Sequence, residues 1–539
     1  MLLCAGLLAA WCVVGLALRT PLADGLPRLR ESWWDGAVIL AAFTLAAPAL
    51  RGLRAEKLAS FVEPARPAVL GAMRAWIAAI LLAQVLWEDL PSSAYLPRGM
   101  LDLRHHWLVA LLHGLPIGFD RFLASHTALQ AYEAVTIALL LLAMAGLRAR
   151  WTVPAAALAY LLYAHILRSY AWSYHMGLIP LHALLVLSLT PCGDGWSLDR
   201  VLRARRGLPV APPEPRLRYG MGRFLVWMAI AIPYTMAGFS KLRKGGALWW
   251  RGEHMKQMIV STVVEPMQFG FRTAFVALHW PGWIWDALGL MAIVGELTFV
   301  LVLVSRLARR LLPLIMVGMH VGILFMQNIL FPDLIAIQAV FYDWAPLRRR
   351  LAARWTALTH RQSPHLATSP AMATAPPPSD APAAASVIAD ARDRLFRRQA
   401  LAAQVLLAAA FVVWTARMEK FPLSAMQMFS TRLELEPVEF VRPFAVYADG
   451  RREPARFERW IPAMSDSRYR RLIRDWERPE RLAVLHEFLD RSAARANAAA
   501  PPGRRIRRFE LERRRWDFRR HPDEPDGTLL AVLCHDVRP

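Results

Sequence analysis

The sequence predicts an all-α polytopic integral membrane protein with a small mixed α/β domain at its C-terminal end, outside the membrane. Three observations lead to this fold class. The 539-residue chain is 56% hydrophobic and has a mean hydropathy of +0.28, which is above the usual range of soluble chains. Its apolar residues gather into long segments, and many of its basic residues lie in the short loops between them. Residues 424–539 contain no further apolar span.

The apolar segments predict about eleven membrane spans, because a helix of about 17 to 25 apolar residues crosses a bilayer. We expect the first segment to be a membrane helix and not a signal peptide, since no basic residue precedes it and no clear cleavage site follows. The expected spans cover residues 2–18, 34–50, 68–88, 129–147, 151–167, 173–190, 222–240, 281–304, 311–330, 333–346 and 400–417.

The charge of the loops predicts the orientation of these spans. With a cytoplasmic N-terminus, the loops "RGLRAEK", "RAR", "RVLRARRG" and "SRLARR" and the segment 347–399 all fall on the cytoplasmic side. The loop "RTPLADGLPRLRES" is the exception, because it falls outside despite its three arginines. The net charge of +23 is then explained by contact with anionic lipid, and no nucleic-acid partner is expected. We expect a bacterial inner-membrane protein whose C-terminal domain is extracytoplasmic.

The chain is expected to divide into four parts. Residues 1–346 form the multi-span membrane domain. Residues 347–399 are basic at first and then rich in Pro, Ala and Ser, as in a disordered cytoplasmic linker. Residues 400–418 form the last transmembrane helix. Residues 424–539 form an Arg-rich outer domain, with strands expected in "FVRPFAVYADG" and "RRFELERRRWDF" and a helix between them.

Ionisable side chains within a bilayer are energetically expensive and therefore indicate function. In the expected topology Glu133, His165, His175 and Lys241 come from separate spans and meet in the outer third of the membrane. We place a candidate site there. Other polar residues within the spans are His182, Asp286, Glu296, His320 and the pair Gln327-Asn328.

Lys241 has two competing interpretations. It ends the stretch "YTMAGFSKLRKGG", so it can be an anchor that reaches the headgroups with its amine. Arg243 and Lys244 follow at once, however, and can provide that anchoring instead. An amine beside apolar walls loses water, which disfavours the ammonium form and lets a lysine act as a general base near neutral pH. Such a pocket suits a lipid-soluble substrate such as a quinol.

The other candidates also have structural interpretations. His175 and His182 are seven residues apart and share one helix face, which is typical of hydrogen bonding between helices. Glu296 can be a buried acid that a neighbour satisfies. Trp249 and Trp250 can belong to an aromatic belt at the membrane surface, or they can contact the ring of a substrate.

The histidines and cysteines do not form a metal-binding pattern. His105 and His106 are adjacent, so on a helix their side chains diverge by about 100 degrees. The four cysteines include no CxxC pair. We therefore predict no metal site.

Four stretches of the membrane domain resemble the sequence motifs of a known protein family. They are "YTMAGFSKL" with the following "WWRG", "WSYHMGLIPLHALLVLSLTPCGDGWSLD", "GELTFVLVLV" and "MVGMHVGILFMQNILF". In combination they resemble the HTTM (horizontally transferred transmembrane domain) family, which includes the vitamin K-dependent gamma-glutamyl carboxylases. The resemblance covers approximately residues 70–345. It implies an enzyme in which a lysine deprotonates reduced vitamin K and oxygen converts the quinol to an epoxide and a strong base. That base removes a glutamate γ-proton before carbon dioxide adds.

The family pattern Ala-Gly-x-x-Lys-Leu matches Ala237, Gly238 and Leu242, so the resemblance assigns the base to Lys241. The implied cofactor is a reduced quinone of the vitamin K or menaquinone type, with O2 and CO2 as co-substrates. The implied partners are membrane lipid and a glutamate-containing peptide. The predicted catalytic residues are Lys241 as base, His175 and His320 as polar partners and Glu296 as the acid that orients the site, and the predicted cofactor contacts are Trp249, Trp250 and Tyr234.

The chain also departs from the family. Trp172 stands where the carboxylases carry a histidine before Ser-Tyr, although His175 lies three residues further on and can face the same way on a helix. The terminal domain is much smaller than the lumenal part of the carboxylases. A non-catalytic HTTM scaffold that binds an outer-face protein through residues 424–539 is therefore an alternative. A transporter is disfavoured, because the sequence shows neither repeated halves nor paired broken helices.

Overall fold

The computed structural model describes residues 46, 48–171, 175–246, 248–264, 269–344, 393–427, 429–430, 436–476 and 479–538. The expected span 2–18, nearly all of the span 34–50 and most of the linker 347–399 lie outside the described residues, as does Trp172.

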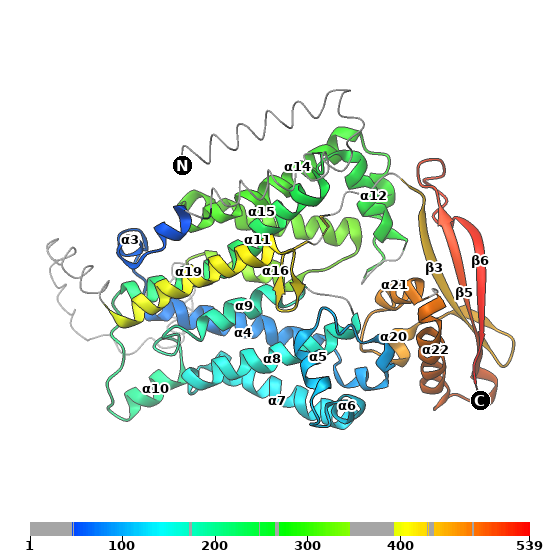
Figure 1. The fold of residues 1–539 in the computed structure, drawn as a ribbon, viewed down its shortest axis with the longest axis horizontal. Helices are drawn as coiled ribbons and strands as arrows, with labels where there is room; N and C mark the ends of the chain where they lie inside the picture. Colours follow the sequence, from blue (N-terminus) through cyan, green and yellow to red (C-terminus); the bar gives the residue numbers. More distant parts are fainter. Residues whose placement is uncertain are drawn as a thin grey trace, which may run out of the picture.

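The described chain forms a bundle of long helices with a small sheet domain at one end (Figure 1). Its membrane part contains α3 (Ala55–Phe61), α4 (Pro67–Trp87), α5 (Trp107–Gly114), α6 (Phe119–Ala124), α7 (His126–Ala145), α8 (Ala149–Ala171), α9 (Leu178–Leu187), α10 (Leu198–Arg205), α11 (Leu217–Gly245), α12 (Gly252–Val263), α13 (Thr273–Ala277), α14 (Gly282–Thr298), α15 (Arg306–Gln327), α16 (Pro332–Ala336) and α19 (Arg394–Thr415). The terminal part contains β1 (Glu419–Lys420), β2 (Leu423–Ser424), β3 (Val438–Tyr447), β4 (Arg452–Pro454), α20 (Phe457–Trp460), α21 (Asp466–Trp476), α22 (Leu482–Asn497), β5 (Ile506–Trp516) and β6 (Thr528–Asp536).

Six helices in the described part of the chain are long and apolar enough to cross a membrane. They are α4, α7, α11, α14 with the short turn that follows it, α15 and α19. The membrane class is thus supported, whereas the count of eleven spans stays a prediction. The expected spans 173–190 and 333–346 contain only the shorter apolar helices Leu178–Leu187 and Pro332–Phe341.

The last membrane helix begins earlier than expected. The sequence predicts that residues 394–399 belong to the linker, but α19 already starts at Arg394. The side chain of Asp393 caps this start by accepting a hydrogen bond from the Leu395 amide at 2.9 Å, and such caps satisfy amides that have no partner within the helix.

Among the six helices α11 is the most buried. It packs against α4, α9, α14 and α19 and therefore occupies the centre of the bundle. Its apolar side chains lie on all faces, as expected for a helix surrounded by other helices. Gly246, with a φ of 72° and a ψ of −174°, ends it, because this backbone conformation is open to glycine and is strained for other residues.

The terminal domain is mixed α and β, as expected. Its antiparallel sheet has the strand order β4-β3-β5-β6, and β3 and β5 coincide with the two predicted strands. The helices α21 and α22 pack against β3 and β5. Phe457 lies at the centre of the domain core, with ring centroids 5.0 Å from Phe488, 5.7 Å from Phe509 and 5.8 Å from Tyr469.

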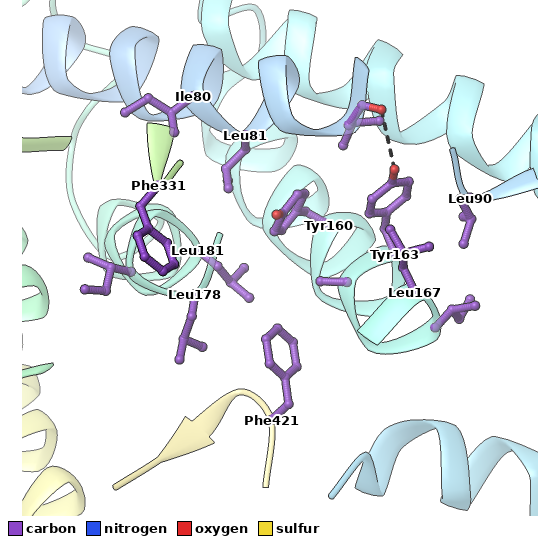
Figure 2. Close-up of a cluster of buried hydrophobic side chains, with 14 of the residues drawn as sticks. Ile80, Leu81, Leu90, Tyr160, Tyr163, Leu167, Leu178, Leu181, Phe331 and Phe421 are labelled. Carbon is purple, nitrogen blue, oxygen red and sulfur yellow. Dashed lines mark hydrogen bonds between the residues drawn. The ribbon is translucent and has the colours of Figure 1, made fainter. Parts of the chain in front are cut away.

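The hairpin β1–β2 follows α19 and inserts between membrane helices. Figure 2 shows Phe421 pointing from the hairpin into a cluster of buried apolar side chains. The Nε2 atom of His165 on α8 lies 2.7 Å from the Phe421 carbonyl oxygen, and Nε2 of His182 on α9 donates to the Pro422 carbonyl at 2.8 Å. Two histidines of the predicted spans thus hold a backbone segment in place, and the partner of His182 is this hairpin and not a second helix.

His106 lies beside this hairpin, in surroundings that disfavour its protonated form. Its ring is fully buried, stacks on Phe421 with centroids 6.0 Å apart and meets His165 edge-on at 5.8 Å. Burial, reinforced by the neighbouring His165, lowers the pKa of His106 to about 3, and Arg168 and His105 act in the same direction while Asp102 opposes them.

Acidification is expected to destabilise the protein through His106. The unfolded chain binds a proton at His106 below its ordinary pKa, but the folded chain binds it only near pH 3, so stability is lost as the pH falls. For one such group the free energy of unfolding should drop by about 2 kcal/mol between pH 7 and pH 5. Thermal unfolding in detergent at both pH values measures this drop. His106→Phe, which can keep the stacking, should remove this part of the drop, and an equal drop in both proteins would contradict the assignment.

Candidate functional site around Lys241

The amine of Lys241 points into the bundle and pairs with Glu296. Lys241 lies near the end of α11, and its Nζ donates to Oε1 and Oε2 of Glu296 on α14 at 2.8 and 2.6 Å. Lys241 is 4% exposed and Glu296 is 6% exposed. The anchor interpretation of Lys241 does not fit this geometry. An ion pair enclosed between helices is costly to form, so it needs a close and well-ordered helix contact.

Gly238 provides that close contact one turn before Lys241. A Cβ atom at this position would lie 2.9 Å from the backbone nitrogen of Leu297, which is closer than real Cβ atoms come to a backbone. Leu297 directly follows Glu296, so the missing side chain at Gly238 brings α14 to the lysine. This is the way in which small residues let membrane helices approach one another.

The two basic residues after Lys241 have different environments. Nη1 of Arg243 donates to the carbonyl oxygens of Trp414 and Thr415, at 2.8 and 3.3 Å, in the last turn of α19. Arg243 thus satisfies carbonyls that lack partners within their own helix. Lys244 is exposed and is the residue here that is placed to anchor the helix.

Trp249 forms one wall of the lysine site. Its ring centroid is 5.3 Å from the Lys241 Nζ, within the range of a cation–π contact. The indole is 1% exposed and donates from Nε1 to the Phe429 carbonyl at 2.9 Å. Trp250 is half-buried beneath Arg251, 5.5 Å from its guanidinium carbon. Among the described contacts, Trp249 reaches the lysine and Trp250 does not.

His320 and Tyr234 lie together, and Tyr234 is two turns before Lys241 on α11. Nδ1 of His320 donates to the Met316 carbonyl at 2.7 Å, so Nε2 of the neutral ring carries the lone pair. The ring meets Tyr234 edge-on with centroids 5.9 Å apart. The hydroxyl of Tyr234 accepts a hydrogen bond from Nε2 of Gln338 at 2.9 Å. Among the described hydrogen bonds, none joins His320 to Lys241.

His175 approaches the same site from the hairpin side. Its Nε2 lies 3.3 Å from the Ser424 hydroxyl, and the carbonyl of the next residue, Ala425, accepts a hydrogen bond at 2.7 Å from the hydroxyl of Ser240, which directly precedes Lys241. Of the four residues predicted to meet in the outer third of the membrane, the structure relates His175 to Lys241. His165 contacts the hairpin instead, and Glu133 lies beside Leu90 and Tyr163.

A second group of buried polar residues was missed by the sequence analysis. Arg168 on α8 pairs with Glu88 at 3.3 Å, with side-chain exposures of 2% and 9%. Nε2 of Gln84 donates to the same carboxylate at 3.3 Å. Arg468 of the terminal domain lies close enough for electrostatic interaction with Arg168 and Glu88. Glu88 and Arg168 lie at the ends of apolar segments. The signal in the sequence that could have indicated this group is the arginine in "AHILRSY", which is Arg168.

No group of three or more His, Cys, Asp or Glu side chains that could hold a metal ion occurs in the part of the chain that the structure describes. Comparison of the chain with known protein families, with curated proteins and with solved structures finds no match.

Proposed function

We propose that this protein is a membrane enzyme of the quinol-dependent carboxylase type, in which Lys241 takes a proton from a reduced quinone. The observation that carries the proposal is the buried amine of Lys241, bound by both oxygens of Glu296 between α11 and α14. Membrane proteins rarely keep an ionisable group within the bundle unless it has a function. The type of reaction is taken from the HTTM resemblance, which assigns the base to the same lysine.

Aromatic residues near Lys241 support a quinol as the ligand. Trp249 and Tyr234 offer aromatic surfaces, and Trp249 lies in an apolar cluster with Met255, Met258 and Trp285. A flat, lipid-soluble ring is stabilised by such walls. When bound, a reduced quinone supplies an acidic hydroxyl group and the electrons for reaction with O2.

Glu296 prepares the lysine for its role as a base. An ammonium group cannot accept a proton, but transfer of its proton to Glu296 leaves a neutral amine beside a neutral acid. Exclusion of water by an apolar ligand favours these neutral forms. Lys241 then accepts the hydroxyl proton, and the neutral ring of His320 offers a second acceptor at Nε2.

The proposal is tested with the purified full-length protein in detergent, supplied with a reduced naphthoquinone and O2. We expect O2 consumption and epoxide formation above the rate of spontaneous quinol oxidation. Isotope-labelled CO2 and a glutamate-containing peptide then test whether carboxylation is coupled to this step. A rate equal to that of the protein-free control would contradict the enzyme proposal.

A non-catalytic scaffold is the second candidate, and one observation favours it. The edge strand β6 exposes Leu529, Leu530 and Val532, and an open apolar edge can pair with a strand of an outer-face protein. A scaffold would tolerate the loss of the Lys241 amine, whereas the enzyme would not. The Lys241 variants described in the Discussion therefore separate the two functions.

A further inference from the structure

A cavity of about 590 Å³ lies at the end of the bundle away from the terminal domain. Its volume is within the range of about 300–1,000 Å³ that is typical of small-molecule sites. In Figure 1, α10 and the start of α19 mark this end of the bundle. The walls come from the start of α8, residues 188–194 after α9, α10, residues 210–211 and the first turns of α19.

The cavity has an excess of positive charge. Its lining includes the four arginines Arg150, Arg200, Arg203 and Arg398 against two aspartates, Asp194 and Asp199. Within the described part of the chain, no ion pair to a carboxylate joins any of the four arginines. Nη1 of Arg200 instead donates to the carbonyl oxygens of residues 194 and 211, which leaves its charge uncompensated.

The two aspartates are already engaged in holding the walls together. The carboxylate of Asp199 accepts hydrogen bonds from the amides of Arg148 and Ala149, at 2.6 and 2.8 Å, at the start of α8. Oδ2 of Asp194 accepts from the Tyr219 hydroxyl at 2.7 Å. Both acids are thus fixed to neighbouring elements, and the guanidinium groups are left to bind an anion.

Large apolar side chains are exposed around this cavity. Trp151 directly follows Arg150 and is 69% exposed, Leu189 lies in the lining and is 55% exposed, and Trp196 is 52% exposed. Exposed tryptophans at the ends of membrane helices are typical of the headgroup level of a bilayer. The arginines therefore lie where phosphate groups meet acyl chains.

We propose that this cavity binds the phosphate headgroup of an anionic phospholipid, with the acyl chains lying against the exposed apolar side chains of Trp151 and Leu189. Basic pockets between the ends of membrane helices are suited to anionic headgroups, and arginine binds phosphate oxygens through two parallel hydrogen bonds. A soluble phosphate compound would gain nothing from the apolar rim. The proposal is independent of the chemistry at Lys241, which lies at the other end of α11.

Native mass spectrometry of the full-length protein tests the proposal. Phosphatidylglycerol and phosphatidylcholine with the same acyl chains are offered to the wild type, and glycerol 3-phosphate serves as a soluble competitor. We expect preferential binding of phosphatidylglycerol that glycerol 3-phosphate does not displace. Arg150→Gln, Arg203→Gln and Arg398→Gln combined should weaken this binding roughly a hundredfold, since each arginine near a charged lipid contributes about fivefold.

The matched control removes three charges at the same end but outside the cavity lining, as Arg205→Gln, Arg206→Gln and Arg394→Gln. It should keep the preference for phosphatidylglycerol within about threefold of the wild type. The single substitution Arg203→Gln, with an expected loss of about fivefold, serves if the triple variant does not fold. Equal losses in the cavity and control variants, equal binding of both lipids, or displacement by glycerol 3-phosphate would each overturn the proposal.

Discussion

Replacing Glu296 by glutamine should lower the free energy of unfolding by about 3–5 kcal/mol, because removing one partner of a buried ion pair leaves the other charge buried and uncompensated. Both carboxylate oxygens of Glu296 accept from the Lys241 amine, and the two side chains are only 5% and 8% exposed. The carboxamide of glutamine keeps the shape of the side chain, so the loss of stability measures the effect of removing the negative charge. Unfolding of the purified protein in detergent measures it.

Two controls show that the effect belongs to this pair. The combination of Lys241→Met and Glu296→Met removes both charges and should regain most of the stability that either single change loses. Glu487→Gln breaks an ion pair with Arg491 that has a comparable distance of 2.7 Å but side-chain exposures of 46% and 41%, and such surface pairs contribute about 1 kcal/mol at most. A cost for Glu296→Gln as small as that for Glu487→Gln would mean that water reaches Lys241.

Replacing Lys241 by arginine should abolish quinol oxidation and leave most of the stability. A guanidinium group can bind both oxygens of Glu296, but it does not lose its proton in proteins. General base catalysis contributes about 10²–10⁴ in rate, so epoxide formation should fall at least a hundredfold. Initial rates of O2 consumption and epoxide formation, measured beside the unfolding transition, separate this loss from a loss of folded protein.

Lys244→Arg is the matched control for this substitution. It makes the same chemical change three residues further along α11, on a side chain that is exposed, and its rate should equal that of the wild type. A folded Lys241→Arg protein that keeps the wild-type rate would exclude Lys241 as the base. If the wild type also shows no quinol oxidation, the scaffold interpretation is favoured.

The helical membrane class and the terminal strands could be predicted from the sequence, because both depend on local patterns. Long apolar runs produced α4, α11 and α15 nearly where they were expected. In the segments that contain α9 and α16 the helices are shorter than the expected spans, since hydropathy does not report where a helix starts or stops. The helix α9 begins after Gly177, which is left-handed with a φ of 72°, and α16 begins at Pro332.

The composition of the lysine site could be predicted, but its contacts could not. Lys241 and Glu296 were both identified as candidates because charges within apolar segments are rare. Their pairing joins residues 55 positions apart and depends on the close approach of α14 to Gly238. The hydrophobic periodicity of a sequence does not indicate which two helices approach each other. The contacts of His165 and His182 with the hairpin could not be predicted either. Their partners are backbone carbonyl groups, which every residue has, so the sequence does not indicate which of them a histidine contacts.

The reactivity of the lysines tests the central claim, an enclosed Lys241 amine, most directly. The lysines of the chain are Lys57, Lys241, Lys244, Lys256 and Lys420, so few peptides need to be followed after treatment of the folded protein with a water-soluble amine-reactive reagent. We expect Lys244 to be modified rapidly and Lys241 to remain unmodified until the protein is unfolded. Modification of Lys241 at the rate of Lys244 in the folded protein would contradict the account.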